Sequence, residues 1–334
     1  MTAAVAVDLG KTGCRAVLWT DGTDPAQHVH EVAGAPGLAD GGGVATARAA
    51  VCAAVLPLLE RQRSLKPTTV CVGAAGAATD PQAARALAVH LLDDLPVHEV
   101  AVTSDAVTAH AGALGGRPGV VLAIGTGCVA VGIGADGSFA RVDGWGPWLG
   151  DEGSGAWIGT AGLRAALRAH DGRGPDTVLL RAAVERFGDP DRLPSAIGRD
   201  GSPARTTASF APDVARAADA GDAAAAGILR QAAGHLATTV RAAAHRVGGR
   251  QHLDVTVTGG LTGLGEPLLE PLRSALADSP RPLHLRPPLG RPLEGARMLA
   301  VKPPASHEPH VVRVQRATPT VPTQPPAPAA AVQE

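Results

Sequence analysis

Residues 3–19, Ala-Ala-Val-Ala-Val-Asp8-Leu-Gly10-Lys11-Thr12-Gly-Cys-Arg-Ala-Val-Leu-Trp19, carry a pattern on which the rest of the chain is organised. Two apolar runs, residues 3–8 and 14–19, predict buried strands, and the glycines between them predict a tight turn. The same order returns in residues 120–133, where Gly125-Thr126-Gly127 separates two further apolar runs. Each half of the chain is therefore expected to open with a strand, a Gly/Thr turn and a second strand.

The remaining segments alternate between strand and helix patterns, which is typical of an α/β protein. Strands are expected at residues 28–32, 69–72, 97–102, 139–142 and 254–257, and helices at 43–63, 81–92, 106–114, 266–277 and 294–301. Residues 153–247 have a helical pattern, which a polar segment containing Pro and Gly interrupts at 188–212. Eight prolines fall in residues 302–334, so we expect a disordered tail there.

Composition limits the classes of partner. The 30 basic and 31 acidic residues leave a formal net charge of −1, without the basic excess that binding to a phosphate backbone requires. The chain has four tryptophans, three phenylalanines and no tyrosine, which is poor material for stacking on bases. With 45% hydrophobic residues in 334, it can bury a core and is long enough for two domains. We therefore expect a globular protein that binds no nucleic acid.

The cysteines and apolar runs of the sequence bear on where in the cell the protein is located, and the histidines bear on metal binding. Cys14, Cys52, Cys71 and Cys128 form no C-x-x-C pair, which argues against a disulfide framework or a zinc ribbon. The 12 histidines show no metal-ligand spacing, so no structural metal is expected. Residues 1–10 lack a leader pattern, and no run approaches the roughly 18 apolar residues of a membrane span. These features predict a cytoplasmic protein without a membrane partner.

The turn at residues 8–12 combines groups that suit a nucleotide phosphate. Gly10 frees backbone N–H groups, Lys11 supplies an ammonium and Thr12 a hydroxyl group. The carboxylate of Asp8 can contact a metal ion through water. The alternative is an ordinary hairpin turn with a surface lysine.

Two further turns have a similar composition. Gly125-Thr126-Gly127 lies between two predicted strands, and Thr258-Gly259-Gly260 lies between a strand and a helix, where open α/β sheets place ligands. Two such turns that face each other across a cleft could hold a polyphosphate from both sides. The alternative for each is a plain tight turn.

Asp105 lies directly after the strand predicted at residues 97–102. A carboxylate at that position can accept the proton of an attacking hydroxyl group, as a general base. The alternative is structural, because Ser104 or Asp105 can cap the helix predicted at residues 106–114.

Residues 143–159 are unusual, because they hold three of the four tryptophans, Trp145, Trp148 and Trp157, among many glycines. Indole faces can pack on a sugar ring, and Asp151 can accept hydrogen bonds from sugar hydroxyl groups. The alternative is the start of a helix, in which residues 151–154 cap the helix and the tryptophans form a local core. Both can hold at once.

Five motifs resemble, in order, those of N-acetylglucosamine kinases in the actin-like ATPase and sugar kinase superfamily. The Gly/Thr turns are shared across the superfamily, whereas the Gly-Trp-Gly…Gly-Asp-Glu-Gly-Ser-Gly stretch is specific. The resemblance spans residues 3 to about 300 and implies an α/β fold of two ribonuclease-H-like (actin-like ATPase) domains with a cleft between them. The motifs are Asp8-Leu-Gly-Lys-Thr12, Ser104-Asp105-Ala106, Ile124-Gly-Thr-Gly127, Gly144-Trp-Gly-Pro-Trp-Leu-Gly-Asp-Glu-Gly-Ser-Gly155 and Thr258-Gly-Gly260.

The resemblance also implies roles for individual residues. Asp105 would be the general base on the 6-hydroxyl group of an amino sugar, most simply N-acetylglucosamine or glucosamine, and Asp8 would lie near the waters of Mg²⁺. The residues implied to bind ATP are Gly10, Lys11, Thr12, Gly125, Thr126, Gly127, Gly259 and Gly260, and those implied to bind the sugar are Ser104, Asp105, Thr126, Gly144, Trp145 and Asp151.

The implied domains are residues 1–117 and residues 118–301, the second with a helical insertion. The last helix, at about 292–301, would pack back on the first domain, as in relatives. Relatives are often homodimers, although no motif in the sequence marks an interface.

Two positions depart from the family pattern. Ser104 stands where relatives usually have an asparagine before the catalytic aspartate. The loop Gly34-Ala-Pro-Gly37 lacks the asparagine that some relatives use to hold sugar hydroxyl groups. These departures leave the reaction as expected, but they leave the preferred amino sugar open.

Two other functions remain open on the same fold. An ATPase that activates 2-hydroxyacyl-CoA dehydratases or benzoyl-CoA reductases would share the phosphate turns, but it would hold an iron–sulfur cluster between subunits through cysteines. No cysteine pair has a suitable placement in the sequence. A non-catalytic sugar-binding regulator would normally carry a DNA-binding helix-turn-helix or lack the base, whereas Asp105 is present.

Overall fold

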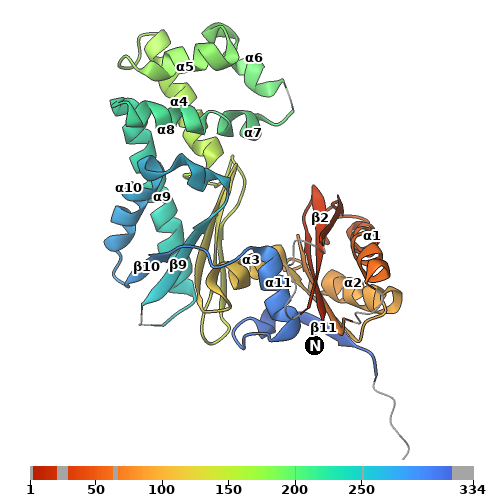
Figure 1. Cartoon of the computed structure of the whole chain (residues 1–334). Helices are drawn as coiled ribbons and strands as arrows, with labels where there is room; N and C mark the ends of the chain where they lie inside the picture. The colour runs from red at the N-terminus through yellow and green to blue at the C-terminus, as the bar shows by residue number, and fades with distance from the viewer. Residues whose placement is uncertain (1–2, 21–28, 63–66, 200, 250–251, 318–334) are drawn as a thin grey trace, which may run out of the picture.

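Two β-sheets with closely related strand orders form the framework of the structure (Figure 1). The computed structural model describes residues 3–20, 29–62, 67–199, 201–249 and 252–317. The first sheet has the order β11-β5-β4-β1-β2-β3, and the second has the order β10-β9-β6-β7-β8. The strands are β1 (Ala4–Leu9), β2 (Gly13–Trp19), β3 (Val29–Ala33), β4 (Thr69–Ala74), β5 (Glu99–Ser104), β6 (Gly119–Ile124), β7 (Cys128–Ile133), β8 (Phe139–Asp143), β9 (Leu253–Thr258), β10 (Leu283–Arg286) and β11 (Val312–Gln315).

Both sheets are built by the same steps. The first three strands of each half, β1-β2-β3 and β6-β7-β8, pair in antiparallel fashion. The next two strands of each half lie parallel to the first one, and helical segments supply the crossovers that parallel pairing requires. The predicted α/β class is confirmed, and the repeated strand, turn and strand mark the start of two units with one topology.

The first sheet buries a different set of helices on each face. Val5 of β1 lies in an apolar cluster with α1 and α2, whereas Ala4 faces the cluster that includes α3 and α11. This division follows from the strand geometry, because successive side chains point to opposite faces of a sheet. These helices are α1 (Gly43–Arg61), α2 (Pro81–Asp94), α3 (Asp105–Leu114) and α11 (Pro292–Val301).

Helix α1 is long and apolar enough, by length and composition, to cross a membrane. The expectation that no run reaches this length is therefore wrong for residues 43–61. The helix packs on β2 and β3 and buries Val51, Ala54 and Val55 in the first core, and a core helix of a globular protein meets the same criterion. In the described parts of the chain it is the single helix of this kind.

The second lobe combines the second sheet with a helical cap. Helix α9 runs along β6, β7 and β8, and α4 to α8 gather beyond one end of that sheet (Figure 1). The interruption predicted at residues 188–212 contains short helices rather than an open loop. The elements are α4 (Gly155–His170), α5 (Val178–Phe187), η2 (Pro190–Arg192), α6 (Leu193–Gly198), α7 (Pro203–Ala208), α8 (Ala211–Asp219), α9 (Ala223–Arg246), η3 (Gly260–Leu264) and α10 (Glu266–Ala277).

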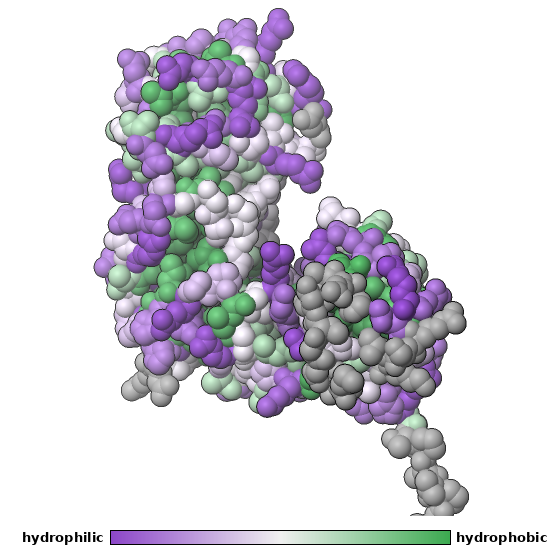
Figure 2. All heavy atoms as spheres, viewed as in Figure 1, coloured by the Kyte–Doolittle hydropathy of each residue, from purple (hydrophilic) through white to green (hydrophobic). Residues whose placement is uncertain are grey.

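Helices α3 and α11 form the junction between the lobes. Helix α3 contacts β4 and β5 of the first sheet and also β6, β7 and β9 of the second. Helix α11 packs along α3 and on β1 and β4. In space-filling view a notch separates the two lobes above this junction (Figure 2).

The expectation of a disordered tail from Lys302 is wrong for the part that the structure describes. After η4 (Glu308–His310), strand β11 pairs with the edge strand β5. The short stretch before it bridges the lobes: the hydroxyl group of Thr103 donates to the carbonyl of His310 at 2.6 Å, and Nε2 of His310 donates to the carbonyl of Gly137 at 2.9 Å. Residues 318–334 lie outside the described residues.

A pair of buried histidines supports the same bridge. Nδ1 of His110 on α3 lies 3.0 Å from Nε2 of His307, and both residues have no solvent exposure. Burial lowers the pKa of His110 to about 3 and that of His307 to about 4. Both rings are therefore neutral at physiological pH, and they link the C-terminal segment to α3 without a buried charge.

Candidate active site

A cleft of about 950 Å³ lies between the two lobes and is lined from both sheets. Most of the residues that the motifs singled out meet there. Those that line it are Asp8, Lys11, Ser104, Asp105, Gly125, Gly127, Gly144, Asp151, Gly259 and Gly260, whereas Gly10, Thr12, Thr126 and Trp145 are chain neighbours of lining residues and do not line it themselves.

Strand register explains why residues far apart in sequence meet in this cleft. Leu9 on β1 pairs with Ala74 on β4, and Ala74 pairs with Ser104 on β5, so three parallel strands end at one edge. Asp8 and Asp105 are adjacent to those ends. The carboxyl edge of parallel strands is where α/β sheets place ligands, and here two such edges contribute to one cleft.

The first Gly/Thr turn is held by the loop that follows β3. The N–H of Gly10 donates to the carbonyl of Gly13 at 2.9 Å, and the N–H of Ala35 donates to the carbonyl of Gly10 at 3.2 Å. The loop comes so close that a Cβ atom on Gly34 would lie 2.3 Å from the oxygen of Gly10. Glycine is required at position 34 for the turn to keep this support.

The second Gly/Thr turn is held by the start of helix α4. The N–H groups of Gly155 and Ala156 donate to the carbonyls of Gly125 and Thr126, at 2.8 and 3.1 Å. The hydroxyl oxygen of Ser154 accepts from the N–H of Trp157 and caps the helix, as the structural alternative predicted. The turn is therefore fixed to a rigid element.

Ser104 and Asp105 divide the structural and chemical roles between them. Ser104 caps α3 by accepting from the N–H of Val107 at 3.2 Å. Asp105 is half-buried, and one of its oxygens accepts from the N–H of Ala106 at 2.8 Å. Burial raises the pKa of Asp105, although that N–H and the nearby Arg141 oppose the shift. A partly desolvated carboxylate with a raised pKa is suited to accept a proton.

Asp8 lies in the same electrostatic environment. Burial, and next the charge of Asp105, raise the pKa of Asp8, whereas Arg15 lowers it. Two partly buried carboxylates with few cations nearby leave an excess of negative charge in the cleft. A divalent cation with oxygen ligands would offset that excess.

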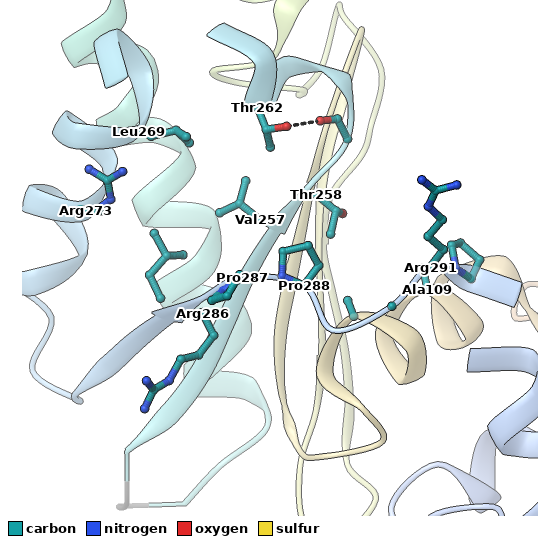
Figure 3. Close-up of a pocket in the computed structure, with 15 residues that line it drawn as sticks. Ala109, Val257, Thr258, Thr262, Leu269, Arg273, Arg286, Pro287, Pro288 and Arg291 are labelled. Carbon is teal, nitrogen blue, oxygen red and sulfur yellow. Dashed lines mark hydrogen bonds between the residues drawn. The ribbon is translucent and has the colours of Figure 1, made fainter. Parts of the chain in front are cut away.

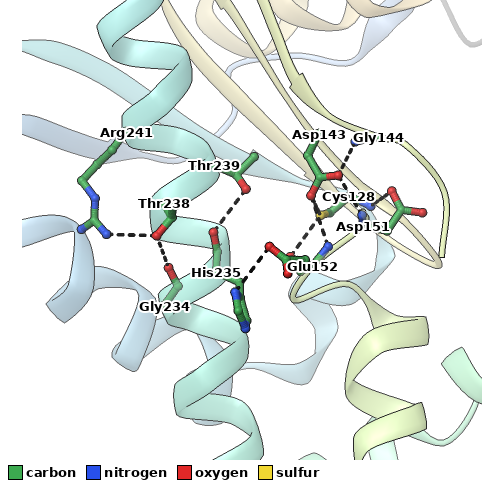
Figure 4. Close-up of polar contacts among 10 residues, drawn as sticks. All are labelled: Cys128, Asp143, Gly144, Asp151, Glu152, Gly234, His235, Thr238, Thr239 and Arg241. Atoms are coloured by element: carbon green, nitrogen blue, oxygen red, sulfur yellow. Dashed lines mark hydrogen bonds and ion pairs between the residues drawn. The ribbon is translucent and has the colours of Figure 1, made fainter. Parts of the chain in front are cut away.

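Arg141, which lines the cleft, and Asp143, which holds the loop beside it, are not singled out by the sequence motifs. Arg141 lines the cleft, donates to the carbonyl of Gly144 at 2.8 Å and lies 5.6 Å from the ring centre of Trp145. Asp143 collects backbone N–H groups from both ends of the loop that follows it (Figure 4). The sequence signal was weak, because Asp143 only borders the glycine-rich motif and Arg141 lies in a predicted strand.

The tryptophans of this segment are not a local core. Trp145 is 66% exposed, Trp148 is 88% exposed and the neighbouring Leu149 is 85% exposed. Trp157 is half-buried on α4, where its ring meets that of His235 in an edge arrangement. The local-core alternative is therefore wrong for Trp145 and Trp148, whose indole rings are free to contact a ligand.

A second cavity of about 720 Å³ adjoins the cleft and shares Ala109, Gly259 and Pro292 with it (Figure 3). Much of its wall is apolar, from Val257 on β9 to Pro288 after β10. The hydroxyl group of Thr262 donates to the carbonyl of Gly259 at 2.8 Å, which steadies the third glycine turn at the junction (Figure 3). This shape suits a nucleoside whose phosphates extend into the cleft.

Arginines line the rim of the second cavity. Arg273 forms two hydrogen bonds of 2.7 Å with Glu266, and Arg286 lies 3.5 Å from a carboxylate oxygen of Asp254. Arg291, at the start of α11, forms no ion pair with any residue that the structure describes. It is the rim arginine that is free to meet an anionic ligand.

Comparison with solved structures identifies the architecture. A crystal structure from Chromobacterium violaceum, of a candidate N-acetylglucosamine kinase, is 28% identical, with a TM-score of 0.65, and the match covers 90% of this chain and 99% of that one. A glucokinase of the ROK family from Streptomyces griseus, solved with glucose and AMPPNP, is 18% identical with a TM-score of 0.51 over 89% of this chain and 99% of that one, which shows the fold alone. The two sheets therefore form the fold of actin-like ATPases and ROK-type sugar kinases.

Sequence comparison agrees. The N-acetylmuramic acid/N-acetylglucosamine kinase of Clostridium acetobutylicum is 31% identical over 178 residues, which are 52% of this chain. The chain spans only 58% of the length of that relative in this match. The model of a family of ATPases matches residues 5–282, from β1 to the residue before β10, and thus includes the Gly/Thr turns of both sheets. The chain belongs to the BadF/BadG/BcrA/BcrD ATPase family.

Proposed function

We propose that the protein is an ATP-dependent kinase of amino sugars, which transfers the γ-phosphoryl group to the 6-hydroxyl group of N-acetylglucosamine or glucosamine. The observation that carries this proposal is the meeting, in one cleft, of the half-buried Asp105, the buried Asp151 and Gly/Thr turns from two different sheets. The names of the clostridial relative and of the Chromobacterium structure support the same substrate class.

Positioning and charge neutralisation are the main demands of phosphoryl transfer. The turns at Gly10–Thr12 and Gly125–Gly127 would hold the phosphates of ATP from opposite lobes, with the ammonium of Lys11 near them. The carboxylate of Asp105 would accept the proton of the 6-hydroxyl group as the new oxygen–phosphorus bond forms. The bond between the γ-phosphorus and the bridging oxygen breaks, and ADP leaves with that electron pair.

The residues of the cleft fit Mg²⁺ bound largely through water. Asp8 offers a carboxylate oxygen beside the first phosphate turn. Burial raises its pKa, and the negative charge of Asp105 raises it further. A cation bound there would offset this excess of negative charge. The described residues contain no cluster of three or more acidic, Cys or His side chains that could hold a metal by themselves. Mg²⁺ that keeps waters and shares the substrate's phosphates needs only one or two carboxylates. When bound, it would neutralise charge on the transferred group.

Closure of the two lobes would complete the site. We assign residues 1–117 and 118–301 as the two domains, with α11 packed back on the first, because the chain passes from the first sheet to the second at residues 115–118, after α3. The adenosine would occupy the apolar second cavity beside Gly259 and Gly260. Closure brings the two phosphate turns together and excludes water from the reaction.

The cysteines favour a kinase over an activating ATPase with a cluster between subunits. All four are free thiols; Cys14, Cys71 and Cys128 are buried and Cys52 is half-buried. Burial raises the pKa of Cys14 to about 12 and that of Cys71 to about 12, whereas cluster ligands are thiolates. Free thiols also agree with a reducing, cytoplasmic location.

ATP-dependent phosphorylation of a sugar panel tests the proposal. The panel contains N-acetylglucosamine, glucosamine, N-acetylmannosamine, N-acetylmuramic acid, glucose and a blank, and NMR locates the phosphate on the product. Formation of a 6-phosphate on one amino sugar supports the kinase. ATP hydrolysis that no sugar stimulates contradicts it and favours an activating ATPase, whose sample would contain iron when prepared without oxygen.

A further inference from the structure

Asp143, the last residue of β8, gathers the loop that follows it around its carboxylate (Figure 4). One oxygen accepts from the N–H of Gly144 at 2.8 Å and from the N–H of Asp151 at 2.7 Å. The other accepts from the N–H of Glu152 at 3.2 Å and from the thiol of Cys128 at 3.4 Å. A single side chain therefore ties together both ends of the loop and the second phosphate turn.

This arrangement requires an unfavourable backbone conformation at two residues, Asp143 and Asp151. In the described residues, Asp143 with φ of 65° and Asp151 with φ of 55° are the two non-glycine residues in the left-handed region. Aspartate reaches this region more readily than most residues, yet it is still uncommon there. Such a conformation persists only when the surroundings determine it, and at both positions the hydrogen bonds to Asp143 do so.

Asp151 transmits this constraint to the second phosphate turn. Its side chain is 9% exposed, and one of its oxygens accepts from the N–H of Cys128 at 3.3 Å. A Cβ atom on Gly127 would lie 2.6 Å from its other oxygen, so the carboxylate rests directly on that turn. Asp143 thus fixes the backbone of Asp151, and Asp151 contacts the turn.

The loop is fixed from its other side by Arg141. Gly144, the first residue of the loop, donates through its N–H to Asp143 and accepts through its carbonyl from Arg141 at 2.8 Å. The guanidinium of Arg141 also lies over the ring of Trp145. The loop, whose tryptophan and leucine side chains are exposed, is therefore held by hydrogen bonds at its two ends and not by burial of apolar side chains.

We propose that Asp143 is a positioning residue for sugar binding: it holds Asp151 and the Gly144–Gly150 loop in the geometry that receives the sugar. This inference rests on the kinase function proposed above. It assigns to Asp143 no contact with the substrate. Its effect reaches the sugar through Asp151. The second phosphate turn is also held by the N–H groups of Gly155 and Ala156, so loss of the carboxylate should weaken sugar binding while the ATP side of the cleft is little changed.

Two variants separate the carboxylate from the backbone conformation. Asp143→Asn keeps the size of the side chain but replaces one accepting oxygen by an NH₂ group, which cannot accept from the donors around it. Asp143→Gly keeps access to positive φ and removes both acceptors. We expect KM for the amino sugar that the wild-type protein phosphorylates fastest to rise at least about 10-fold in both, with KM for ATP changed by less than about 3-fold.

Hydrogen exchange of the peptide that covers residues 143–152 supplies a readout independent of turnover. Amide protons that bond to Asp143 should exchange at least about 10-fold faster in both variants, while Tm stays within a few degrees of the wild-type value. Faster exchange with an unchanged sugar KM would overturn the positioning role and leave a purely structural one. Unchanged exchange would overturn the contacts themselves.

The proposed function and this inference can fail separately. If the wild-type protein phosphorylates no sugar, the kinase proposal fails whatever the variants do, and the sugar-positioning role fails with it. If the wild-type protein is a sugar kinase and both variants keep the wild-type sugar KM, only the role of Asp143 is overturned.

Discussion

Asp105 at the start of α3 acts on Asp8 at the end of β1: burial raises the pKa of Asp8, and the charge of Asp105 raises it further. Parallel strands bring the two carboxylates to one edge of the first sheet, about 100 residues apart in the chain. Two acidic groups in such a position are costly for folding and useful for binding a cation and accepting a proton.

Asp105→Asn is expected to lower kcat by about 10²- to 10⁴-fold, the usual contribution of a general base. The amide retains the size of the carboxyl group but cannot take the proton of the sugar hydroxyl group. KM for ATP should change little, because in the proposed kinase Asp105 would contact the sugar hydroxyl group and not the nucleotide. A coupled assay of ADP release measures both constants, and an Asn variant with wild-type kcat would show that another group is the base.

The same substitution should stabilise the free protein at neutral pH. Because the pKa of Asp105 is raised in the folded state, folding favours its protonated form, and stability falls as pH rises from about 4 through the raised pKa. Asp105→Asn removes this cost, so its Tm should exceed that of wild type by roughly 2 °C at pH 7.5, with a smaller gap toward pH 4. A Tm of Asp105→Asn below that of the wild type at pH 7.5 would contradict a raised pKa of Asp105 in the folded protein.

Asp136 offers a control, because its pKa is shifted in the direction opposite to that of Asp105. Its pKa is lowered, because it accepts hydrogen bonds from the hydroxyl group and the N–H of Ser138. The stability that this carboxylate contributes is present above its ordinary pKa and is lost as pH falls through the lowered value. Asp136→Asn should therefore leave Tm unchanged or slightly lower at pH 7.5, and it should not alter kcat.

Two glycines of the second Gly/Thr turn, Gly125 and Gly127, are expected to behave differently. A Cβ atom on Gly125 meets nothing within 4 Å, whereas one on Gly127 would lie 2.6 Å from the carboxylate of Asp151. Gly125→Ala should fold normally and raise KM for ATP, because the methyl group occupies the space that phosphates would use. Gly127→Ala should displace Asp151 and raise KM for the sugar. Equal effects of both variants on both constants would argue against separate phosphate and sugar sides.

The C-terminal segment should contribute substantially to stability. Arg313 on β11 pairs with Glu99 on β5 at 2.6 Å, with the two side chains only 17% and 14% exposed. Arg313→Ala is expected to lower the free energy of unfolding by about 2–4 kcal/mol, because it leaves Glu99 desolvated without its partner. Arg15→Ala breaks a pair with Glu31 whose side chains are 45% and 54% exposed, and it should cost about 0–1 kcal/mol. Urea denaturation compares the two; equal losses would mean that the Arg313–Glu99 pair stabilises the fold no more than an exposed pair does.

Local patterns were sufficient for most of the framework and for most of the cleft. Apolar runs and the Gly/Thr turns predicted β1, β2, β6 and β7, since the signal for a buried strand lies within six or seven consecutive residues. Motif order places Asp105 and Asp151 in one predicted site, although the first belongs to α3 and the second to the loop after β8. Strands β10 and β11 were missed because each has four residues and no fully buried position.

The sequence by itself determined the class of the fold, the repeated strand, turn and strand of its two halves, and the chemical groups of the cleft. Each of these features depends on a pattern of residues that are neighbours in the chain. Only the tertiary structure decided that Val312–Gln315 complete the first sheet, that Trp145 and Trp148 are exposed, and that Asp143 holds Asp151. These features depend on hydrogen bonds and burial between segments distant in sequence, such as Thr103 with His310 and Cys128 with Asp143. Local propensity carries no information about such pairs, since their energy exists only once the chain has folded.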